Sequence, residues 1–247
     1  NALLTYIHET GNAKFVDGKM IFLQGSPVLT EKHGIKIGRL SGIVAHLVPA
    51  YLQKNRMPSY ETNCIEDWEQ KVEAIVDETI HEDMRLISGI PPWVQMYFDK
   101  LSEKSGGKAI KDIFRNFQLF VYGGVNFEPY RAKIEASIGK KIAAIETYPA
   151  SEGFIAYQDS QTEKGLLLLA DAGMFYEFIP ADEYYNEKPT RLSLGEVEID
   201  KNYALILNTN AGLWGYSIGD TVKFISLNPY KIVVTGRIKH FISAFGE

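Results

Sequence analysis

The sequence changes its pattern at Gly153, and this change limits the folds that the chain can adopt. Before Gly153, apolar residues at helical spacing alternate with short apolar runs, which is typical of helices packed on a parallel sheet. After Gly153, β-branched and aromatic runs are separated by turn residues, which is typical of an antiparallel meander or a small β-barrel. The sequence therefore predicts an α/β portion followed by an all-β portion.

Two stretches give the first portion its α/β character. The clearest predicted helix covers 65–80, because its apolar residues form one stripe and its acidic residues come early, where the helix dipole favours negative charge. The block 117–147 predicts strand, helix and strand, which is a βαβ unit with a parallel sheet. Shorter predicted elements are a strand at 19–23, a helix from 40 up to Pro49, a helix at 93–101 and a loop at 102–108.

The second portion consists of short predicted strands that are separated by turns. We expect them at 154–157, 165–169, 174–179, 195–199, 202–208, 220–225 and 231–235. A ligand cleft commonly forms where two such portions meet, so the residues near Gly153 are candidates for a binding site.

Composition excludes several classes of protein. The 247 residues carry a net charge of −5, which argues against a nucleic-acid partner. The single cysteine, Cys64, excludes an intrachain disulfide and fits a cytoplasmic protein. The longest purely aliphatic run, 166–169, is too short to cross a membrane, so we expect no membrane partner. Because the chain starts at Asn1 rather than at Met, we expect a piece of a longer protein.

The stretch 146–153 is the first candidate site. The apolar run 142–145 predicts a short buried strand, and hydroxyls, a proline and the carboxylates of Glu146 and Glu152 follow it. Polar groups at the carboxyl end of a strand in an α/β sheet are typical of a ligand site. An ordinary turn with a hydrogen-bonded carboxylate explains the stretch equally well.

Three other signals each have a plainer explanation. Gly123 and Gly124 follow a predicted strand and allow a flat ligand to approach the backbone, although a tight turn needs glycines as well. Asp220 follows a predicted glycine turn, where it could accept two ribose hydroxyls or simply close the turn. Arg237 ends the last strand and could bind phosphate or hydroxyl groups, or belong to a solvated basic turn.

A serine-hydrolase site is a weaker alternative. Ser151 lies in a Gly-x-Ser-x-Gly-like string, and Asp220 and His240 follow in the order that an α/β-hydrolase uses. However, Pro149 replaces the small residue that such an elbow needs, and a strand rather than a helix is expected from Phe154. None of the five histidines has a partner at metal-ligand spacing, so a zinc site is not expected.

The order and spacing of these signals resemble the adenylate-forming superfamily of acyl-CoA synthetases, peptide-synthetase adenylation domains and luciferases. Longer strings are more similar to one branch, the Gretchen Hagen, or auxin-responsive, acyl-acid–amino-acid ligases and their bacterial relatives. These strings are Gly89-Ile90-Pro91-Pro92-Trp93-Val94-Gln95-Met96, Tyr122-Gly123-Gly124-Val125-Asn126-Phe127-Glu128-Pro129-Tyr130, Phe175-Tyr176-Glu177-Phe178 and Gly236-Arg237-Ile238-Lys239-His240-Phe241-Ile242.

The resemblance implies an ATP-dependent ligase that uses Mg²⁺, adenylates a carboxylic acid and transfers the acyl group to an amino acid or another amine. It also implies a role for each matching residue. Gly123 and Gly124 would lie against the adenine, Tyr148 would pack on the base, Ser151 would reach phosphate, Glu152 would hold Mg²⁺, Asp220 would bind the ribose hydroxyls and Arg237 would contact ribose or phosphate. Trp93 and Met96 would line the acyl pocket.

The sequence departs from the family pattern in three places. The phosphate loop and the catalytic lysine of the family have no match here, so we expect a central fragment without turnover. The corresponding domains would be a partial α/β subdomain at 1–153, a β-barrel subdomain at 154–236 and a hinge at 237–247 toward a further domain. Ser217 stands where the wider superfamily usually carries a basic residue. A non-catalytic nucleotide-binding or interaction module of the same fold is the alternative, and the sequence specifies neither the acid, the amine nor the oligomeric state.

Overall fold

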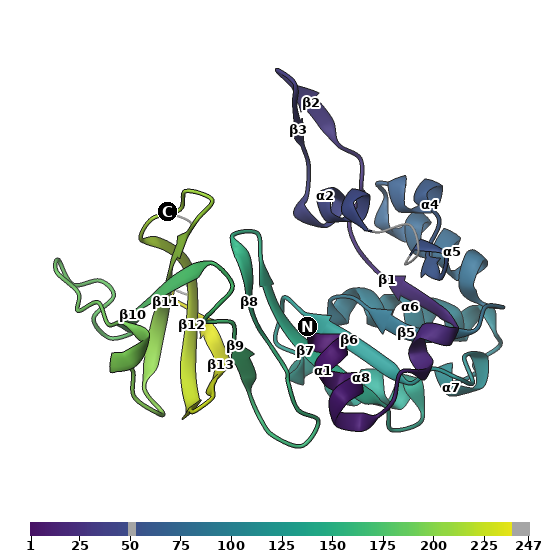
Figure 1. The fold of residues 1–247 in the computed structure, drawn as a ribbon. Coiled ribbons are helices and arrows are strands. Elements are labelled where there is room, and N and C mark those ends of the chain that lie inside the picture. Colours follow the sequence, from purple (N-terminus) through teal and green to yellow (C-terminus); the bar gives the residue numbers. More distant parts are fainter. Residues whose placement is uncertain (49–52, 239–247) are drawn as a thin grey trace, which may run out of the picture. The chain divides into compact units, whose positions relative to one another are not determined.

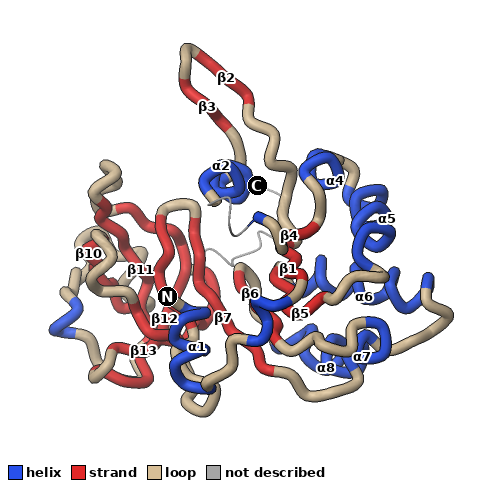
Figure 2. Tube along the Cα trace, turned by 45° about the vertical axis from the view of Figure 1, so that its right-hand side comes forward, coloured by secondary structure: helices blue, strands red, loops and turns tan. Residues whose placement is uncertain are grey.

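A computed structural model describes residues 1–48 and 53–238 of the chain. Its residues group into two compact units, Asn1–Glu146 (unit 1) and Thr147–Glu247 (unit 2). Helices gather in unit 1, whereas strands and loops dominate unit 2 (Figures 1 and 2). The predicted hinge at 237–247 lies outside the described residues from 239 onward, as does His240.

Unit 1 contains a parallel sheet, as the sequence predicted. Its strands occur in the order β4, β1, β5, β6, and each neighbouring pair is parallel. Their bounds are β1 (Lys19–Phe22), β4 (Arg56–Met57), β5 (Met84–Ser88) and β6 (Leu119–Gly123). A separate antiparallel pair, β2 (Thr30–Lys32) and β3 (Ile35–Ile37), projects from this unit (Figure 1).

Along the chain, the helices of unit 1 precede, connect or follow these strands. They are α1 (Ala2–Thr10), the 3-10 helix η1 (Lys14–Asp17), α2 (Leu40–Leu47), α4 (Tyr60–Cys64), α5 (Trp68–Thr79), α6 (Pro91–Lys104), α7 (Ile110–Ile113) and α8 (Glu128–Ile138). The predicted helices from 40 and at 93–101 are confirmed, and prolines stand at the start of α6, where their missing N–H groups cost nothing. The loop expected at 102–108 starts later, because α6 continues to Lys104.

The prediction of one helix over 65–80 is wrong at its start. Asp67 caps α5, because its side chain accepts a hydrogen bond from the Gln70 N–H at 2.9 Å. A separate short helix, α4, ends at Cys64 before this cap. The apolar stripe therefore begins one turn later than the spacing of the apolar residues indicated.

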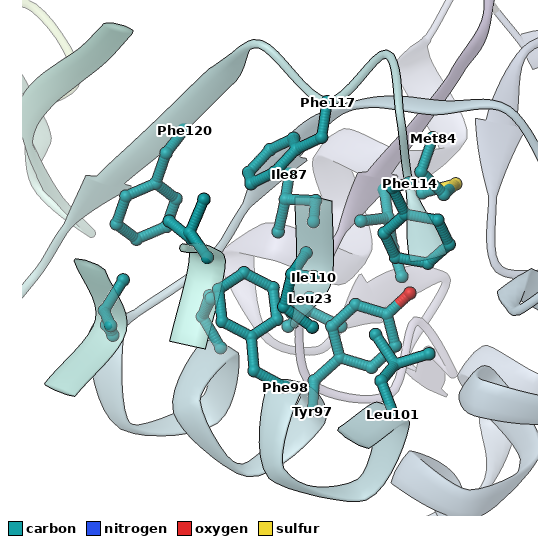
Figure 3. Close-up of a cluster of buried hydrophobic side chains, with 14 of the residues drawn as sticks. Leu23, Met84, Ile87, Tyr97, Phe98, Leu101, Ile110, Phe114, Phe117 and Phe120 are labelled. Carbon is teal, nitrogen blue, oxygen red and sulfur yellow. The ribbon is translucent and has the colours of Figure 1, made fainter. Parts of the chain in front are cut away.

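The main core of unit 1 lies between the sheet and helices α5, α6 and α8. Tyr97, Phe98 and Leu101 of α6 point toward the sheet residues Ile87 and Phe120 (Figure 3). The Tyr97 hydroxyl lies 2.6 Å from the Thr79 hydroxyl, so this buried phenol is paired rather than stranded in the core. A smaller cluster on α1 and η1 packs against Met20, Leu86 and Leu119, so both faces of the sheet are covered, as parallel sheets require.

Unit 2 contains an antiparallel sheet in the strand order β7, β8, β9, β13, β12, β11, β10. The strands are β7 (Ala143–Ala150), β8 (Gly153–Tyr157), β9 (Leu166–Leu168), β10 (Met174–Pro180), β11 (Asn202–Thr209), β12 (Tyr216–Leu227) and β13 (Tyr230–Arg237). Its core contains aromatic residues on adjacent strands, among them Phe178, Tyr203 and Phe224. The predicted change from an α/β to an all-β pattern is therefore confirmed.

Three strand predictions for the second half need correction. The strand expected at 195–199 is a 3-10 helix, η2 (Leu194–Glu196), because Ser193 and Glu196 cap each other and turn the chain. The short strand predicted at 142–145 is longer than expected, since β7 continues to Ala150 and pairs with β8 as a hairpin. The turn expected just before Asp220 is instead part of a strand, because β12 starts earlier, at Tyr216.

Candidate functional site

Three of the residues singled out in the sequence meet in unit 2. The Tyr148 hydroxyl of β7 donates a hydrogen bond to Asp220 Oδ2 at 2.7 Å. Arg237 Nε donates to Asp220 Oδ1 at 2.8 Å, and Arg237 Nη2 donates to the Ile218 carbonyl at 3.0 Å. Each oxygen of the Asp220 carboxylate thus accepts one hydrogen bond from the protein and keeps a lone pair for another donor.

A bulge in β12 sets the position of Asp220. Ser217 pairs with Ile206 and Thr221 with Ala204, so β12 places residues 218–220 opposite the single residue Leu205 of β11. Gly219 within this bulge has φ +79°, a conformation that favours glycine over other residues. Asp220 then pairs directly with Arg237 on β13, which brings the carboxylate and the guanidinium together.

The three side chains differ in exposure. Tyr148 is only 7% exposed, and its burial, with the Asp220 carboxylate beside it, raises the pKa of its phenol, so the phenol stays protonated and donates. The Asp220 side chain is 17% exposed and that of Arg237 is 59% exposed. Paired hydroxyls of a ligand can therefore reach the exposed edge of the Asp220 carboxylate. An anionic group can reach the exposed Arg237 guanidinium.

Ser151 and Glu152 form the turn of the β7–β8 hairpin. Ala150 pairs with Gly153, so only these two residues lie between the paired positions. Ser151 is exposed and Glu152 is half-buried, and neither side chain forms a hydrogen bond or an ion pair within the described part of the chain. The strand expected after Ser151 is confirmed, and a nucleophile elbow would need a helix there.

The described residues contain no group of three or more histidine, cysteine, aspartate or glutamate side chains that could hold a metal ion. Mg²⁺ is often held by one or two carboxylates together with substrate phosphates. Glu152 is a candidate ligand for a magnesium site of this type. The half-buried Glu152 carboxylate fits such a site, because no described side chain holds it in an ion pair.

Gly123, Gly124, Trp93 and Met96 all lie in unit 1. Gly123 ends β6, and Gly124 has φ +80°, where an added Cβ would lie only 3.3 Å from Ile90 Cγ2, so this turn favours glycine. Trp93 packs on Trp68 with ring centroids 4.3 Å apart, whereas Met96, on the next turn of α6, is 37% exposed. Trp93 therefore contributes to packing between α5 and α6, and Met96 offers apolar surface to solvent.

Glu146, the first residue of the candidate stretch 146–153, is half-buried at the end of unit 1. Tyr122 of β6 donates a hydrogen bond to it, and Arg131 of α8 acts on both side chains. Burial raises the pKa of the Glu146 carboxyl, Glu128 raises it further and Arg131 opposes both effects. Burial, together with the nearby Glu146 charge, raises the pKa of Tyr122 to about 12. The sequence indicated the Glu146 carboxylate by its place after an apolar run, but it did not indicate the effects of Tyr122 and Arg131 on it.

We expect Glu146→Gln to stabilise unit 1 more at pH 7 than at pH 4. A carboxyl whose pKa is raised on folding gives its full stability below its unfolded pKa and loses it as the pH rises through the folded value. Glutamine carries no charge at either pH, so it removes that loss. Urea unfolding followed at both pH values tests this, with the exposed Glu66→Gln as the control. An effect of Glu146→Gln that is equal at the two pH values would contradict the assignment.

Comparison with known proteins gives one consistent family. Residues 167–237, which include Asp220 and Arg237, match the GH3 family central domain. Jasmonoyl–L-amino acid synthetase JAR4 of Nicotiana attenuata is 29% identical over 147 residues, which are 56% of this chain and 25% of that protein. Indole-3-acetic acid-amido synthetase GH3.3 of Arabidopsis thaliana is 39% identical over 49 residues, which are 20% of this chain and 8% of that protein.

A solved structure matches nearly the whole chain. The GH3.15 acyl acid amido synthetase superposes with a TM-score of 0.67 at 12% identity, and the match covers 96% of this chain and 51% of that one. At this identity the likeness concerns the fold. The chain therefore spans about half of this solved structure, and its matches span a quarter or less of the two curated relatives named above.

The α/β unit and the antiparallel unit that carries Asp220 and Arg237 share the fold of the GH3.15 acyl acid amido synthetase. The chain is similar to the GH3 family central domain over residues 167–237 and to a jasmonoyl–L-amino acid synthetase over 147 residues. The family resemblance expected from the sequence strings is confirmed. Among residues 1–48 and 53–238, no helix is both long and apolar enough to span a membrane.

Proposed function

We propose that this chain is part of an ATP-dependent ligase that adenylates a carboxylic acid and transfers the acyl group to an amino acid or another amine. The observation that carries the proposal is the Tyr148–Asp220–Arg237 cluster, because two of its three residues lie in the matched GH3 segment. The names of the relatives agree with this reaction class, and one of them, GH3.15, has been solved in complex with 2,4-DB.

In this proposal, Asp220 accepts hydrogen bonds from the ribose hydroxyls and Arg237 binds the ribose or a phosphate. The hydroxyl of Tyr148 holds the carboxylate of Asp220 in place. Packing of the Tyr148 ring on the base would require more of the ring to be exposed than the 7% observed. Gly123 and Gly124 remain candidates for an adenine contact, Ser151 for a phosphate contact, and Trp93 and Met96 for the acyl pocket.

Chemically, the acid carboxylate attacks the α-phosphate of ATP and pyrophosphate leaves, giving acyl-AMP. The amine then attacks the acyl carbonyl, and AMP leaves as the amide forms. The protein's task in the first step is to hold the reactants in line and to stabilise the negative charge that develops on phosphate oxygens. Glu152 would hold Mg²⁺, which supplies positive charge at these oxygens when bound.

The test uses the longer protein that contains this chain as well as the chain itself. We expect acid-dependent exchange of pyrophosphate into ATP by the longer protein, and a loss of about 100-fold in that rate for Glu152→Ala, because one ligand that neutralises phosphate charge is removed. Glu187→Ala, at an exposed glutamate of unit 2, is the control. The 247-residue chain alone should bind nucleotide without turnover.

The outcomes separate the proposal from its alternative. Nucleotide binding by the longer protein without any exchange, over a range of acids, would favour a non-catalytic nucleotide-binding module. Exchange that survives both Glu152→Ala and Asp220→Ala unchanged would exclude these residues from the site.

A further inference from the structure

Two tyrosines that follow β10 reach across to the strands that carry the candidate nucleotide site. The hydroxyls of Tyr184 and Ser217 lie 2.9 Å apart. The Tyr185 hydroxyl donates a hydrogen bond to the Ile238 carbonyl at 3.0 Å. The two rings contact each other edge to face with centroids 5.1 Å apart, so they support one another.

These two hydrogen bonds end at residues close along the chain to Asp220 and to Arg237. Ser217 lies on β12 just before the bulge, and Ile238 directly follows Arg237 at the end of β13. Gly219 in the bulge forms hydrogen bonds with both Ser217 and Ile238. The Gly219 N–H donates to Ser217 Oγ at 3.3 Å, and the Ile238 N–H donates to the Gly219 carbonyl at 2.7 Å.

Packing fixes Tyr184 more firmly than Tyr185. The ring of Tyr184 and the side chain of Ile238 pack against a small apolar cluster formed by Ile179, Ala204 and Ile206. Tyr185 is 65% exposed, so its hydrogen bond to Ile238 adds little to the stability of the unit. An exposed tyrosine whose hydroxyl is nonetheless bonded to the backbone beside Arg237 is better explained by positioning than by stability.

We propose that Tyr184 and Tyr185 are positioning residues for the nucleotide site. Tyr184 fixes the β12 bulge through Ser217, and Tyr185 fixes the end of β13 through Ile238. Together they set the separation of the Asp220 carboxylate and the Arg237 guanidinium. Ser217, the departure from the superfamily pattern, then supplies a neutral hydroxyl that joins the bulge to Tyr184. This inference rests on the proposed function, in which Asp220 binds the ribose.

The test compares the affinities of the 247-residue chain for AMP and for 3′-deoxy-AMP by isothermal titration calorimetry. We expect Tyr185→Phe and Tyr184→Phe to weaken AMP binding by about three- to tenfold, as expected for the loss of one hydrogen bond that orients the site. We also expect the preference for AMP over 3′-deoxy-AMP to shrink, because a displaced carboxylate holds the hydroxyl less well. A purely structural role would not change that preference.

Tyr230→Phe is the matched control, since Tyr230 begins β13 at the end far from Arg237 along the strand. It should bind both nucleotides as the unsubstituted chain does. If the unsubstituted chain does not prefer AMP, the proposed ribose contact of Asp220 fails and this inference fails with it. If that preference exists and both tyrosine variants keep it in full, only the positioning role is overturned.

Discussion

Asp220→Asn is expected to lower the affinity of the chain for AMP by about 100-fold, because hydrogen bonds to a charged acceptor each contribute about 1.5–3 kcal/mol. The substitution keeps the shape of the side chain but removes its charge and one of its two acceptor oxygens. Tyr148 and Arg237 both donate to that carboxylate, so the variant also leaves one of these donors without its acceptor. Isothermal titration with AMP measures the effect.

The control for this prediction is Asp171→Asn, at an exposed aspartate of the same unit. It should bind AMP with unchanged affinity. The thermal unfolding of both variants should be recorded, because loss of binding through unfolding would show as a lowered transition temperature. A folded Asp220→Asn protein that binds AMP as tightly as the unsubstituted chain contradicts the assignment of Asp220 to the site.

The largest expected effect on stability is that of Phe178→Ala in unit 2. Phe178 is fully buried and contacts the ring of Phe224 edge to face, with centroids 5.1 Å apart. Truncation of a buried phenylalanine removes apolar contact and leaves a cavity, which costs about 3–5 kcal/mol. We expect a loss of this size in the unfolding free energy of unit 2, measured by urea unfolding with a tyrosine fluorescence or near-ultraviolet signal.

Phe175→Ala provides a matched comparison on the same strand. Phe175 belongs to β10 as Phe178 does, but it faces solvent and is 61% exposed. Its truncation should change the unfolding free energy by less than about 1 kcal/mol, because little buried contact is lost. Equal losses for the two variants would mean that the two residues are not on opposite faces of the strand.

Residue order along the chain allowed much of the fold to be predicted. Apolar spacing placed α5, α6 and α8, and β-branched runs placed most strands of unit 2. At two places a helix cap made the prediction from the sequence pattern wrong. Asp67 delays the start of α5, and the reciprocal cap of Ser193 and Glu196 turns a strand-like segment into η2. In both cases capping hydrogen bonds outweighed the propensity of the apolar residues nearby.

The sequence allowed the residues of the candidate site to be predicted, but not the contacts between them. The order and spacing of the superfamily signals pointed to Asp220 and Arg237. The sequence did not predict that these two residues pair directly across β12 and β13. The bulge at Gly219 depends on how β11 and β12 align, and alignment between strands is a tertiary property. The bond from Tyr148 to Asp220 joins residues 72 positions apart, which no local pattern can indicate.

The central claim is that the carboxylate held by Tyr148 and Arg237 binds the hydroxyls of a ribose. The most direct measurement is the ratio of the dissociation constants of 2′,3′-dideoxy-AMP and AMP for the unsubstituted 247-residue chain. Two hydroxyls bonded to one carboxylate predict a ratio of at least about 10 in favour of AMP. A ratio of one, with AMP measurably bound, would contradict the claim.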